Sequence, residues 1–563
     1  MAAVLKEELP MPPLPEAREP ESGSTAALSY QRDLWERSVL FLDILRERAD
    51  RMLEHEAEGL PPVLAFAHQV VLDARGFERP AGYALVRITG EDHCLDEAKP
   101  PVIVVDPRAG HGPGIGGFKP DSEVGIALHE GHAVYFVIFF PRPCPGQTLA
   151  DVHHALRRFV AEVARRHPGR PPVLYGNCQG GWAAALLAAD CVGLAGPVVM
   201  NGSPLSYWAG ESDVNPMRLA GGLLGGTWLA HFTADLSGGL FDGAWLVQNF
   251  EALKPAHALW GKSYAVLADP EGERSRFLEF ERWWGGFYFL GREEIVTIAE
   301  NLFVGNRLEQ GVMRICEHCF ADLKRIRSPI VVFASSGDNI TPPHQALNWV
   351  PEVYPGTAEL KRAGQRIVYL INPHVGHLGI FVSAAVAKFE HRAILESLAQ
   401  IETLAPGLYE MKIVNPTGDP DCRKPQYQVR FEERRVEDIR FEYPRGAFER
   451  VRAVSEWNAW AYSSFVSPWV RAFATPMTAE WLKWLHPMRV SRYAFSGRVS
   501  PWMAALPRLA AQVRAQRASA DAANPFVQAE RSASRAVSEA LELWRGAADR
   551  WNELAFSLLY GRR

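Results

Sequence analysis

The residue best suited to covalent chemistry is Cys178, which lies in the segment GNCQGG (176–181). The apolar run PVLY precedes this segment, and the helical pattern WAAALLAAD follows it. A strand, a glycine-flanked turn and a helix in this order form a nucleophile elbow, which lifts its central side chain clear of a sheet. Free cysteine is otherwise among the most buried residue types, and we interpret the other six cysteines in that way. At Cys178 the flanking pattern predicts a nucleophile.

A thiol near its usual pKa is mostly protonated at neutral pH, so it needs a base and an acid that orients the base. In an elbow fold these follow in the order nucleophile, acid, histidine. Asp338 follows the run PIVVFA, and His377 follows the run IVYLINP. We therefore predict a Cys178–His377–Asp338 triad. His374 is the competing histidine, and Asp338 could instead cap a helix.

The developing oxyanion needs backbone donors. The amide of Gln179, directly after the nucleophile, is one candidate. A second donor normally comes from the loop after an earlier strand, here PRAGHGPGIGGF (107–118), and we predict Ala109 or Gly110 for that role. The glycine cluster of this loop is weak support for nucleotide binding. His111 is expected to line the pocket.

Metal binding is not expected. Cys316, His318 and Cys319 resemble half of a zinc site, but no second pair with suitable spacing follows. We expect these residues to belong to the core or to a helix. Seven cysteines in so long a chain indicate reduced thiols and a cytoplasmic protein rather than a disulfide framework.

Short apolar runs alternate with helical patterns between about 84 and 400. The runs are VIVVD (102–106), AVYFVIFF (133–140), PVLYG (172–176), PVVMNG (197–202), PIVVFASSGD (329–338) and IVYLINP (367–373). They do not alternate with polar residues, which is typical of strands buried on both faces of a parallel sheet. With the elbow, they predict an α/β protein with the α/β-hydrolase fold, a mostly parallel central sheet, an inserted helical cap and a mainly helical C-terminal extension.

The domain organisation follows from shifts in composition. We expect a flexible leader at 1–28, an N-terminal helical segment at 29–83, the first part of the core at 84–202, a cap insertion at 203–310, the second part of the core at 311–405, and a strand pair with a helical extension at 406–563. An insertion at this point would lie over the carboxyl ends of the strands, where ligands bind.

The last helix carries a heptad seam. Its members are Val537, Leu541, Trp544, Ala548, Trp551, Ala555 and Leu558. Such a seam predicts lengthwise packing against another helix. The partner could be internal, which is the default, or a second subunit of a homo-oligomer, or a surface.

The bulk properties exclude two function classes. A formal net charge of −5 without a dominant basic tract gives no reason to expect nucleic-acid binding. No apolar run reaches the roughly 20 residues of a spanning helix, so no transmembrane segment is expected. The N-terminus lacks the features of a secretory signal.

Several motifs together resemble the polyhydroxyalkanoate synthases, whose elbow has the form G-x-C-x-G-G. NFEALKPAHALWGKSY (249–264) is similar to the cap segment of that family, and GHLGIF (376–381) is similar to its catalytic-histidine loop. The resemblance covers roughly residues 100 to 385. The chain departs from the family at Gln179, at Trp182, at FERWWGGFYFLG (280–291) and in its C-terminal extension. It therefore resembles a divergent branch.

The resemblance implies an acyltransferase that moves a 3-hydroxyacyl group from coenzyme A onto Cys178 as a thioester, with no other cofactor. The stretch NPFVQAERSASRAVSEALELWRGAADRW (524–551) resembles the phasins, which coat polyester granules, and this implies a granule surface as partner. One alternative is a hydrolase or a thiolase-like depolymerase that cleaves polyhydroxyalkanoate or acyl thioesters with the same triad. A non-catalytic granule-associated protein is the other.

Overall fold

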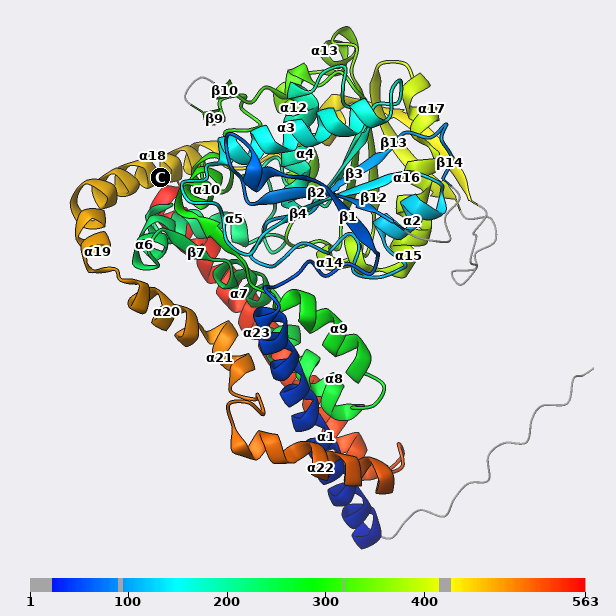
Figure 1. Ribbon diagram of the computed structural model, residues 1–563, viewed down its shortest axis with the longest axis vertical. Helices are drawn as coiled ribbons and strands as arrows, with labels where there is room; N and C mark the ends of the chain where they lie inside the picture. The colour runs from blue at the N-terminus through cyan, green and yellow to red at the C-terminus, as the bar shows by residue number, and fades with distance from the viewer. Residues whose placement is uncertain (1–22, 90–94, 317–318, 415–426, 562–563) are drawn as a thin grey trace, which may run out of the picture.

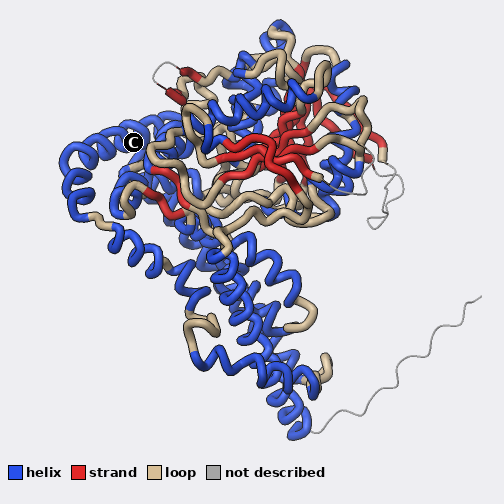
Figure 2. The backbone as a smooth tube through the Cα atoms, in the orientation of Figure 1, coloured by secondary structure: helices blue, strands red, loops and turns tan. Residues whose placement is uncertain are grey.

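The computed structural model describes residues 23–89, 95–316, 319–414 and 427–561. An α/β unit holds one block of strands, and an elongated bundle of helices projects from it (Figures 1 and 2). In sheet order the strands are β1 (His68–Asp73), β2 (Tyr83–Ile88), β4 (Val134–Phe139), β3 (Val102–Val105), β5 (Val173–Asn177), β6 (Val198–Asn201), β11 (Ile330–Ser335), β12 (Arg366–Asn372), β13 (Gly407–Val414) and β14 (Gln428–Arg434).

The central strands are parallel. From β4 through β13 each neighbouring pair is parallel, whereas β2 runs antiparallel to both β1 and β4, and β14 runs antiparallel to β13. An antiparallel second strand beside the order β4-β3-β5-β6, with the elbow after β5, defines the α/β-hydrolase fold. All six apolar runs form strands, so the predicted fold class is confirmed.

Successive residues of these strands face opposite sides of the sheet, and both sides are buried. Ile103 and Leu174 pack on one side, Val102 and Val104 on the other. Helices α3 (Leu149–Arg166), α4 (Gln179–Asp190), α11 (Pro343–Leu347), α12 (Trp349–Val353) and α13 (Thr357–Arg362) cover the first side. Helices α2 (Glu123–His129), α14 (His377–Val382), α15 (Ala384–Val386), α16 (Arg392–Glu396) and α17 (Leu398–Thr403) cover the second. This double cover explains why the strands are apolar throughout.

Three predicted boundaries are wrong. Helix α1 (Gly23–Ala57) begins inside the expected 1–28 leader, and residues 1–22 lie outside the described residues. Strand β1 and the start of β2 fall within the expected helical segment at 29–83 but belong to the main sheet. The sequence pattern of 427–443 predicts both strands of the pair, but only β14 forms there; its partner is β13, and the two extend the same sheet at its other edge. Strands β1 and β14 lie at the edges of the sheet and are partly exposed, so they lack the continuous apolar pattern that identifies a strand buried on both faces.

The insertion between β6 and β11 has two parts. Its elements are α5 (Met217–Leu223), α6 (Trp228–Leu236), β7 (Leu240–Asp242), α7 (Ala244–Ala252), α8 (Lys262–Ala268), α9 (Arg274–Trp284), β8 (Phe289–Gly291), α10 (Arg292–Ile298), β9 (Arg314–Cys316) and β10 (Cys319–Phe320). Ala244 and Val247 of α7 share a buried cluster with Cys178, so this part covers the predicted nucleophile. Helices α8 and α9 instead pack beside α1 in the projecting bundle (Figure 1).

The C-terminal extension is helical, as predicted, and forms most of the rest of the bundle. Its helices are α18 (Arg445–Ala461), α19 (Ser467–Phe473), α20 (Pro476–Leu485), α21 (Pro487–Tyr493), α22 (Pro501–Gln516) and α23 (Pro525–Tyr560). Val39 and Leu40 of α1 pack on Ala510 and Val513 of α22. The N-terminal and C-terminal segments therefore share small apolar cores.

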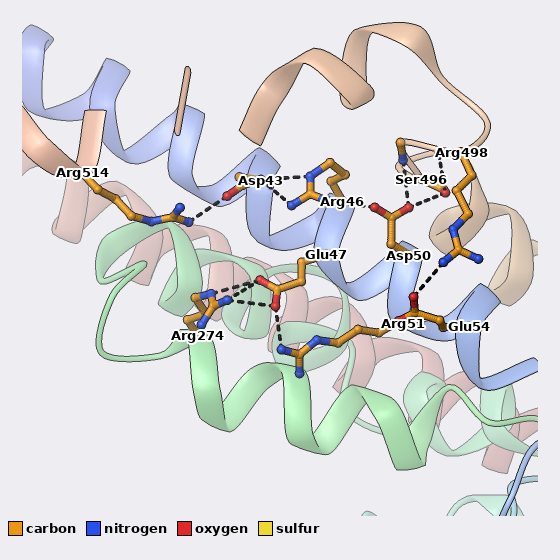
Figure 3. Close-up of polar contacts among 11 residues, drawn as sticks. Asp43, Arg46, Glu47, Asp50, Arg51, Glu54, Arg274, Ser496, Arg498 and Arg514 are labelled. Carbon is orange, nitrogen blue, oxygen red and sulfur yellow. Dashed lines mark hydrogen bonds and ion pairs between the residues drawn. The ribbon is translucent and has the colours of Figure 1, made fainter. Parts of the chain in front are cut away.

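Ion pairs and hydrogen bonds also join α1 to its neighbours in the bundle (Figure 3). Glu47 of α1 forms a bidentate pair with Arg274 of α9, with the closest atoms 2.7 Å apart. Asp43 accepts from Arg514 of α22 at 2.7 Å, and Asp50 accepts from Ser496 at 2.6 Å. The Glu47–Arg274 pair is partly exposed, and such pairs contribute about 0–1 kcal/mol.

The heptad seam of α23 is not its buried face. Val537, Trp544, Trp551 and Leu558, every seventh residue, are exposed. The fully buried positions of this helix are Val527, Ser534, Asp549, Phe556 and Tyr560. The other three seam residues, Leu541, Ala548 and Ala555, are half-buried, and α23 packs on α1, α5 and α18 of the same chain. The expected internal packing is therefore present, but only part of the seam takes part in it.

Candidate active site

Cys178 lies at a strained turn between β5 and α4. Its φ is +48° and its ψ is −121°, a conformation that L residues rarely adopt. The flanking glycines are required by close approach. A Cβ on Gly181 would lie 1.9 Å from Ser203 Oγ, and one on Gly180 would lie 2.1 Å from the Val105 carbonyl oxygen. The elbow is therefore present with the geometry that its sequence indicates.

The three predicted triad residues meet in space. His377 Nε2 lies 3.3 Å from Cys178 Sγ, and His377 Nδ1 lies 2.7 Å from Asp338 Oδ2. The other carboxylate oxygen of Asp338 accepts from the amides of Ile340 and Thr341 at 2.8 and 2.9 Å. These amides fix the carboxylate, which in turn fixes the imidazole. The arrangement can deprotonate a thiol and return the proton to a leaving group.

The protonation of His377 follows from its two partners. Burial lowers its pKa, but the charges of Asp338 and Cys178 and the hydrogen bonds to both outweigh burial and raise the pKa to about 10. A raised pKa favours the imidazolium, the form that stabilises a neighbouring thiolate. His374, the competing histidine, is exposed, although it lies only three residues away.

The remaining cysteines differ from Cys178. Burial raises the pKa of Cys191 to about 11, which makes it unreactive at neutral pH. Cys316 is half-buried in strand β9 and is disulfide-bonded, so the expectation of reduced thiols throughout is wrong, and so is a place for Cys316 in the core or in a helix. Residues 317 and 318 lie outside the described residues. A short hairpin that pairs β9 with β10 was not apparent from its sequence pattern. Cys94 and Cys422 lie outside the described residues.

A buried polar network lies beneath the elbow. Asn177 Nδ2 donates to Glu123 Oε2 at 2.6 Å and to Asp106 Oδ1 at 3.2 Å. Burial raises the pKa of Asp106 to about 6 and raises the pKa of Glu123 well above its usual value. Sequence reasoning missed all three residues. The only available signal was that Asp106 ends a strand and that Asn177 precedes the nucleophile.

The predicted oxyanion loop is tied to the elbow and to the insertion. Asp106 accepts from the amides of Gly114 and Gly116, at 2.7 and 3.3 Å, and so holds the loop in place. Gly110 has a φ of +108°, and its carbonyl accepts from the amide of Tyr288 at 2.9 Å. The Gln179 amide begins α4, as the elbow requires. Ala109 and Gly110 are buried in the loop, and their role as second donor stays a prediction.

The loop also packs on aromatic residues of the insertion. The ring of His111 lies 4.1 Å from that of Trp283, centroid to centroid, and Trp283 donates to the Gly112 carbonyl at 3.1 Å. Burial lowers the pKa of His111 to about 4, so its imidazole is neutral at pH 7. Its role in lining the pocket stays a prediction.

Tyr207 is a further residue that sequence reasoning missed. It follows β6, it is buried, and its hydroxyl has no hydrogen-bond partner among the described residues. Burial and the charge of Cys178 raise its pKa well above the usual value. An uncommitted hydroxyl that responds to the nucleophile's charge can hydrogen-bond a ligand.

The described residues contain no group of three or more His, Cys, Asp or Glu side chains that could hold a metal ion. Among the helices of these residues, none has the length and apolar character needed to cross a bilayer.

Fold and site define the class: an α/β-hydrolase-type protein with a cysteine at its elbow. Residues 33–563 match the family described as "Protein of unknown function (DUF3141)", and the chain belongs to that family. A relative from Rhizobium meliloti, named "Uncharacterized protein in ackA 5'region", is 43% identical over 549 residues, which are 95% of this chain and 74% of the relative.

Solved structures with a similar fold include two lipid or thioester hydrolases. The Paleococcus ferrophilus monoacylglycerol lipase is 15% identical, with a TM-score of 0.34 over 57% of this chain and 99% of the lipase. The thioesterase domain from the curacin biosynthetic pathway is 12% identical, with a TM-score of 0.32 over 60% of this chain and 99% of that domain.

Proposed function

We propose that this protein is an acyltransferase that forms a thioester between Cys178 and a 3-hydroxyacyl group taken from coenzyme A. The observation that carries the proposal is the 3.3 Å approach of His377 Nε2 to Cys178 Sγ, with Asp338 behind the imidazole. A cysteine suits exchange between thioesters, because the acyl-enzyme then has an energy close to that of the donor.

The steps follow from the geometry. The Cys178 thiolate attacks the carbonyl carbon of the donor thioester, and the Gln179 amide stabilises the oxyanion that forms. The tetrahedral intermediate expels the coenzyme A thiolate, which takes a proton from the His377 imidazolium. The neutral imidazole then removes the proton of an acceptor hydroxyl, whose oxygen attacks the acyl-cysteine. Cys178 leaves as a thiolate, and His377 is again an imidazolium. No metal or redox cofactor enters this scheme.

The acceptor separates two forms of the proposal. If the acceptor is the hydroxyl end of a growing polyester, the protein is an enzyme like the polyhydroxyalkanoate synthases, which its motifs resemble. If polyester or another acyl thioester is instead the donor, and water or coenzyme A is the acceptor, the same triad makes the protein a hydrolase or a thiolase-like depolymerase. The Cys178–His377–Asp338 geometry serves both directions.

The test supplies the protein with 3-hydroxybutyryl-coenzyme A and, separately, with amorphous polyester with and without coenzyme A. Free thiol and polymer mass are followed. Thiol release with polymer growth supports synthesis, and loss of polymer supports the depolymerase. If neither changes while the protein still binds granules, the enzymatic proposal fails and a non-catalytic granule-associated protein is left. Cys178→Ser should abolish whichever activity is found, because it replaces the proposed nucleophile. Cys191→Ser, at a buried cysteine outside the triad, is the matched control and should keep that activity.

A granule surface is the proposed location, because the extension exposes many large apolar side chains. We call the following residues of 454–485 the aromatic band: Val454, Trp457, Trp460, Phe465, Val466, Trp469, Phe473, Met477, Trp481, Leu482, Trp484 and Leu485. Such a concentration of exposed apolar residues marks an interaction site, and tryptophan is favoured where an apolar phase meets water.

Co-sedimentation with amorphous polyester granules tests this location. Replacement of Trp469 and Trp481 by serine should lower the bound fraction several-fold, whereas serine at the exposed Trp35 of α1, outside the band, should not. Light scattering of the free protein tests whether the aromatic band instead binds a second copy of the chain. Dimers that dissociate in the double variant would refute the granule role of the band.

A further inference from the structure

A cavity of about 50 Å³ lies beside the N-terminus of α4, next to the residue that follows the nucleophile. It is lined at this end by Gln179, Gly180 and Trp182 of α4 and by Asp106 and Arg108 from the end of β3 and its loop. A single water needs about 10–15 Å³ on this scale, so the cavity has room for a ligand of a few heavy atoms. We call it the Arg108 cavity.

Most of the wall is aliphatic. The apolar lining residues include Leu149, Val152 and Leu156 of α3, Leu186 of α4, and Ile298 and Ile315 of the insertion. A short hydrocarbon chain is the ligand that such a wall favours.

Among the polar side chains that line the cavity, Arg108 and Trp182 carry N–H groups without an acceptor in the described structure, whereas Asp106 and Glu294 contribute carboxyl groups. Arg108 is 93% buried, since its exposed fraction is 7%, yet its Nε and Nη1 have no hydrogen-bond partner among the described residues. Trp182 Nε1 is also buried and has no partner within the described part of the chain. Buried donors are nearly always paired in folded proteins, so three such nitrogen atoms on residues that line one cavity indicate a ligand that supplies acceptor oxygens.

The charge of Arg108 is already balanced. Glu294 Oε1 lies 3.6 Å from Arg108 Nη1, which is close enough for an ion pair but too long for a hydrogen bond. Arg108 Nη2 donates to the Phe289 carbonyl at 2.7 Å, and the guanidinium lies 5.3 Å from the ring centre of Tyr83. Because Glu294 offsets the cation, the ligand that fits is neutral and not a carboxylate.

From this we propose that the Arg108 cavity is the acyl-binding pocket, and that Arg108 and Trp182 select a short acyl chain carrying an oxygen substituent. The hydrocarbon lies along the aliphatic wall, and the hydroxyl of a 3-hydroxyacyl group accepts hydrogen bonds from the two side chains. Trp182 stands where the resembled synthases have threonine, so this pocket would be particular to this chain. The inference rests on the proposed function and names the specificity of that same site.

The test compares 3-hydroxybutyryl-coenzyme A with butyryl-coenzyme A, which lacks only the hydroxyl. Trp182→Phe removes one N–H and keeps the aromatic shape. It should lower kcat/KM for the hydroxylated donor about tenfold and change that for butyryl-coenzyme A less than about twofold. Trp349→Phe is the matched control, because Trp349 is equally buried on the same side of the sheet but donates to the Ala346 carbonyl.

Arg108→Met is a second variant, and its folding is checked by circular dichroism because it leaves Glu294 buried without its cation. If Arg108→Met folds, it should lower kcat/KM for 3-hydroxybutyryl-coenzyme A more than kcat/KM for butyryl-coenzyme A, as Trp182→Phe does. An unchanged preference between the two donors in Trp182→Phe and in folded Arg108→Met would overturn the inference, and so would equal losses for both donors.

Binding separates this inference from the proposed function. Calorimetry with Cys178→Ala protein and each of the two thioesters does not require turnover. A preference for the hydroxylated thioester that Trp182→Phe abolishes supports the pocket even if the wild-type protein never becomes acylated. Equal affinities for the two thioesters would mean that water alone satisfies these donors, and the pocket assignment would be wrong.

Discussion

Asn177 joins the nucleophile elbow to the carboxylate that holds the neighbouring loop. Its side-chain amide donates to Asp106 at 3.2 Å, and Asp106 in turn accepts from the amides of Gly114 and Gly116. The residue before Cys178 therefore fixes both the turn and the loop in which the second oxyanion donor is expected. One network thus couples the strained backbone to the geometry of the candidate site.

Replacing Asn177 by alanine should weaken both fold and site. Two buried carboxyls, Asp106 and Glu123, would lose their shared donor, and leaving such groups unsatisfied costs about 1–3 kcal/mol. We expect a lower free energy of unfolding in denaturant titrations and slower acylation of Cys178. Asn552→Ala, at a half-buried position of α23, is the control. Unchanged stability would show that Asn177 does not hold the network.

The close approach of Gly181 to Ser203 predicts a strong steric effect. In Gly181→Ala the new Cβ would lie 1.9 Å from Ser203 Oγ, so the protein should lose stability. Gly546→Ala, in the middle of α23, meets no atom closer than 3.8 Å and should gain roughly 0.5–1 kcal/mol from helix propensity. Thermal denaturation compares the two. Ser203→Gly should restore stability to Gly181→Ala, and failure to do so would refute the proposed clash.

The raised pKa of His377 predicts a definite pH dependence. Its pKa in the folded protein is about 10, above the ordinary 6.5, so its stabilising contribution is complete below pH 6.5 and is lost as pH rises through about 10. Asp338→Asn should lower the pKa of His377 and remove most of this dependence. NMR titration of the imidazole measures the pKa directly. An imidazole that titrates near 6.5 in the wild-type protein would contradict the ion-pair geometry.

A partly buried ion pair fastens α23 to α1. Arg37 Nη2 lies 2.7 Å from Glu530 Oε2, and the Arg37 side chain is buried. Glu530→Gln should increase hydrogen exchange in α23 while leaving the exchange of β5 and α4 unchanged. Glu47→Gln, at the more exposed pair with Arg274, should change exchange little. Equal effects of the two variants would show that burial of the pair does not matter.

The sequence predicts best where one pattern determines one structure. The six apolar runs became parallel strands, because burial on both faces leaves no polar alternation. The order of Cys178, Asp338 and His377 also predicted their meeting in space, since the ends of parallel strands converge at one edge of the sheet.

Prediction was poorer for features that depend on tertiary contacts rather than on local sequence pattern. Four of the seven residues of the predicted heptad seam, Val537, Trp544, Trp551 and Leu558, face solvent, because spacing does not identify a partner. Strands β1 and β14 lie at the edges of the sheet, where pattern alone does not distinguish core from extension. The carboxyl–amide network at Asn177 joins three segments that are distant in sequence, so no local motif predicts it.

The most direct test of the proposed mechanism is the intact mass of the protein after brief exposure to 3-hydroxybutyryl-coenzyme A. We predict a mass increase of one 3-hydroxybutyryl group, located by peptide mapping at Cys178 and absent in Cys178→Ala and His377→Ala. Hydroxylamine, which cleaves thioesters, should remove it. A wild-type protein that acquires no adduct, or that carries it at Cys191 instead, would contradict the assignment of Cys178 as the nucleophile.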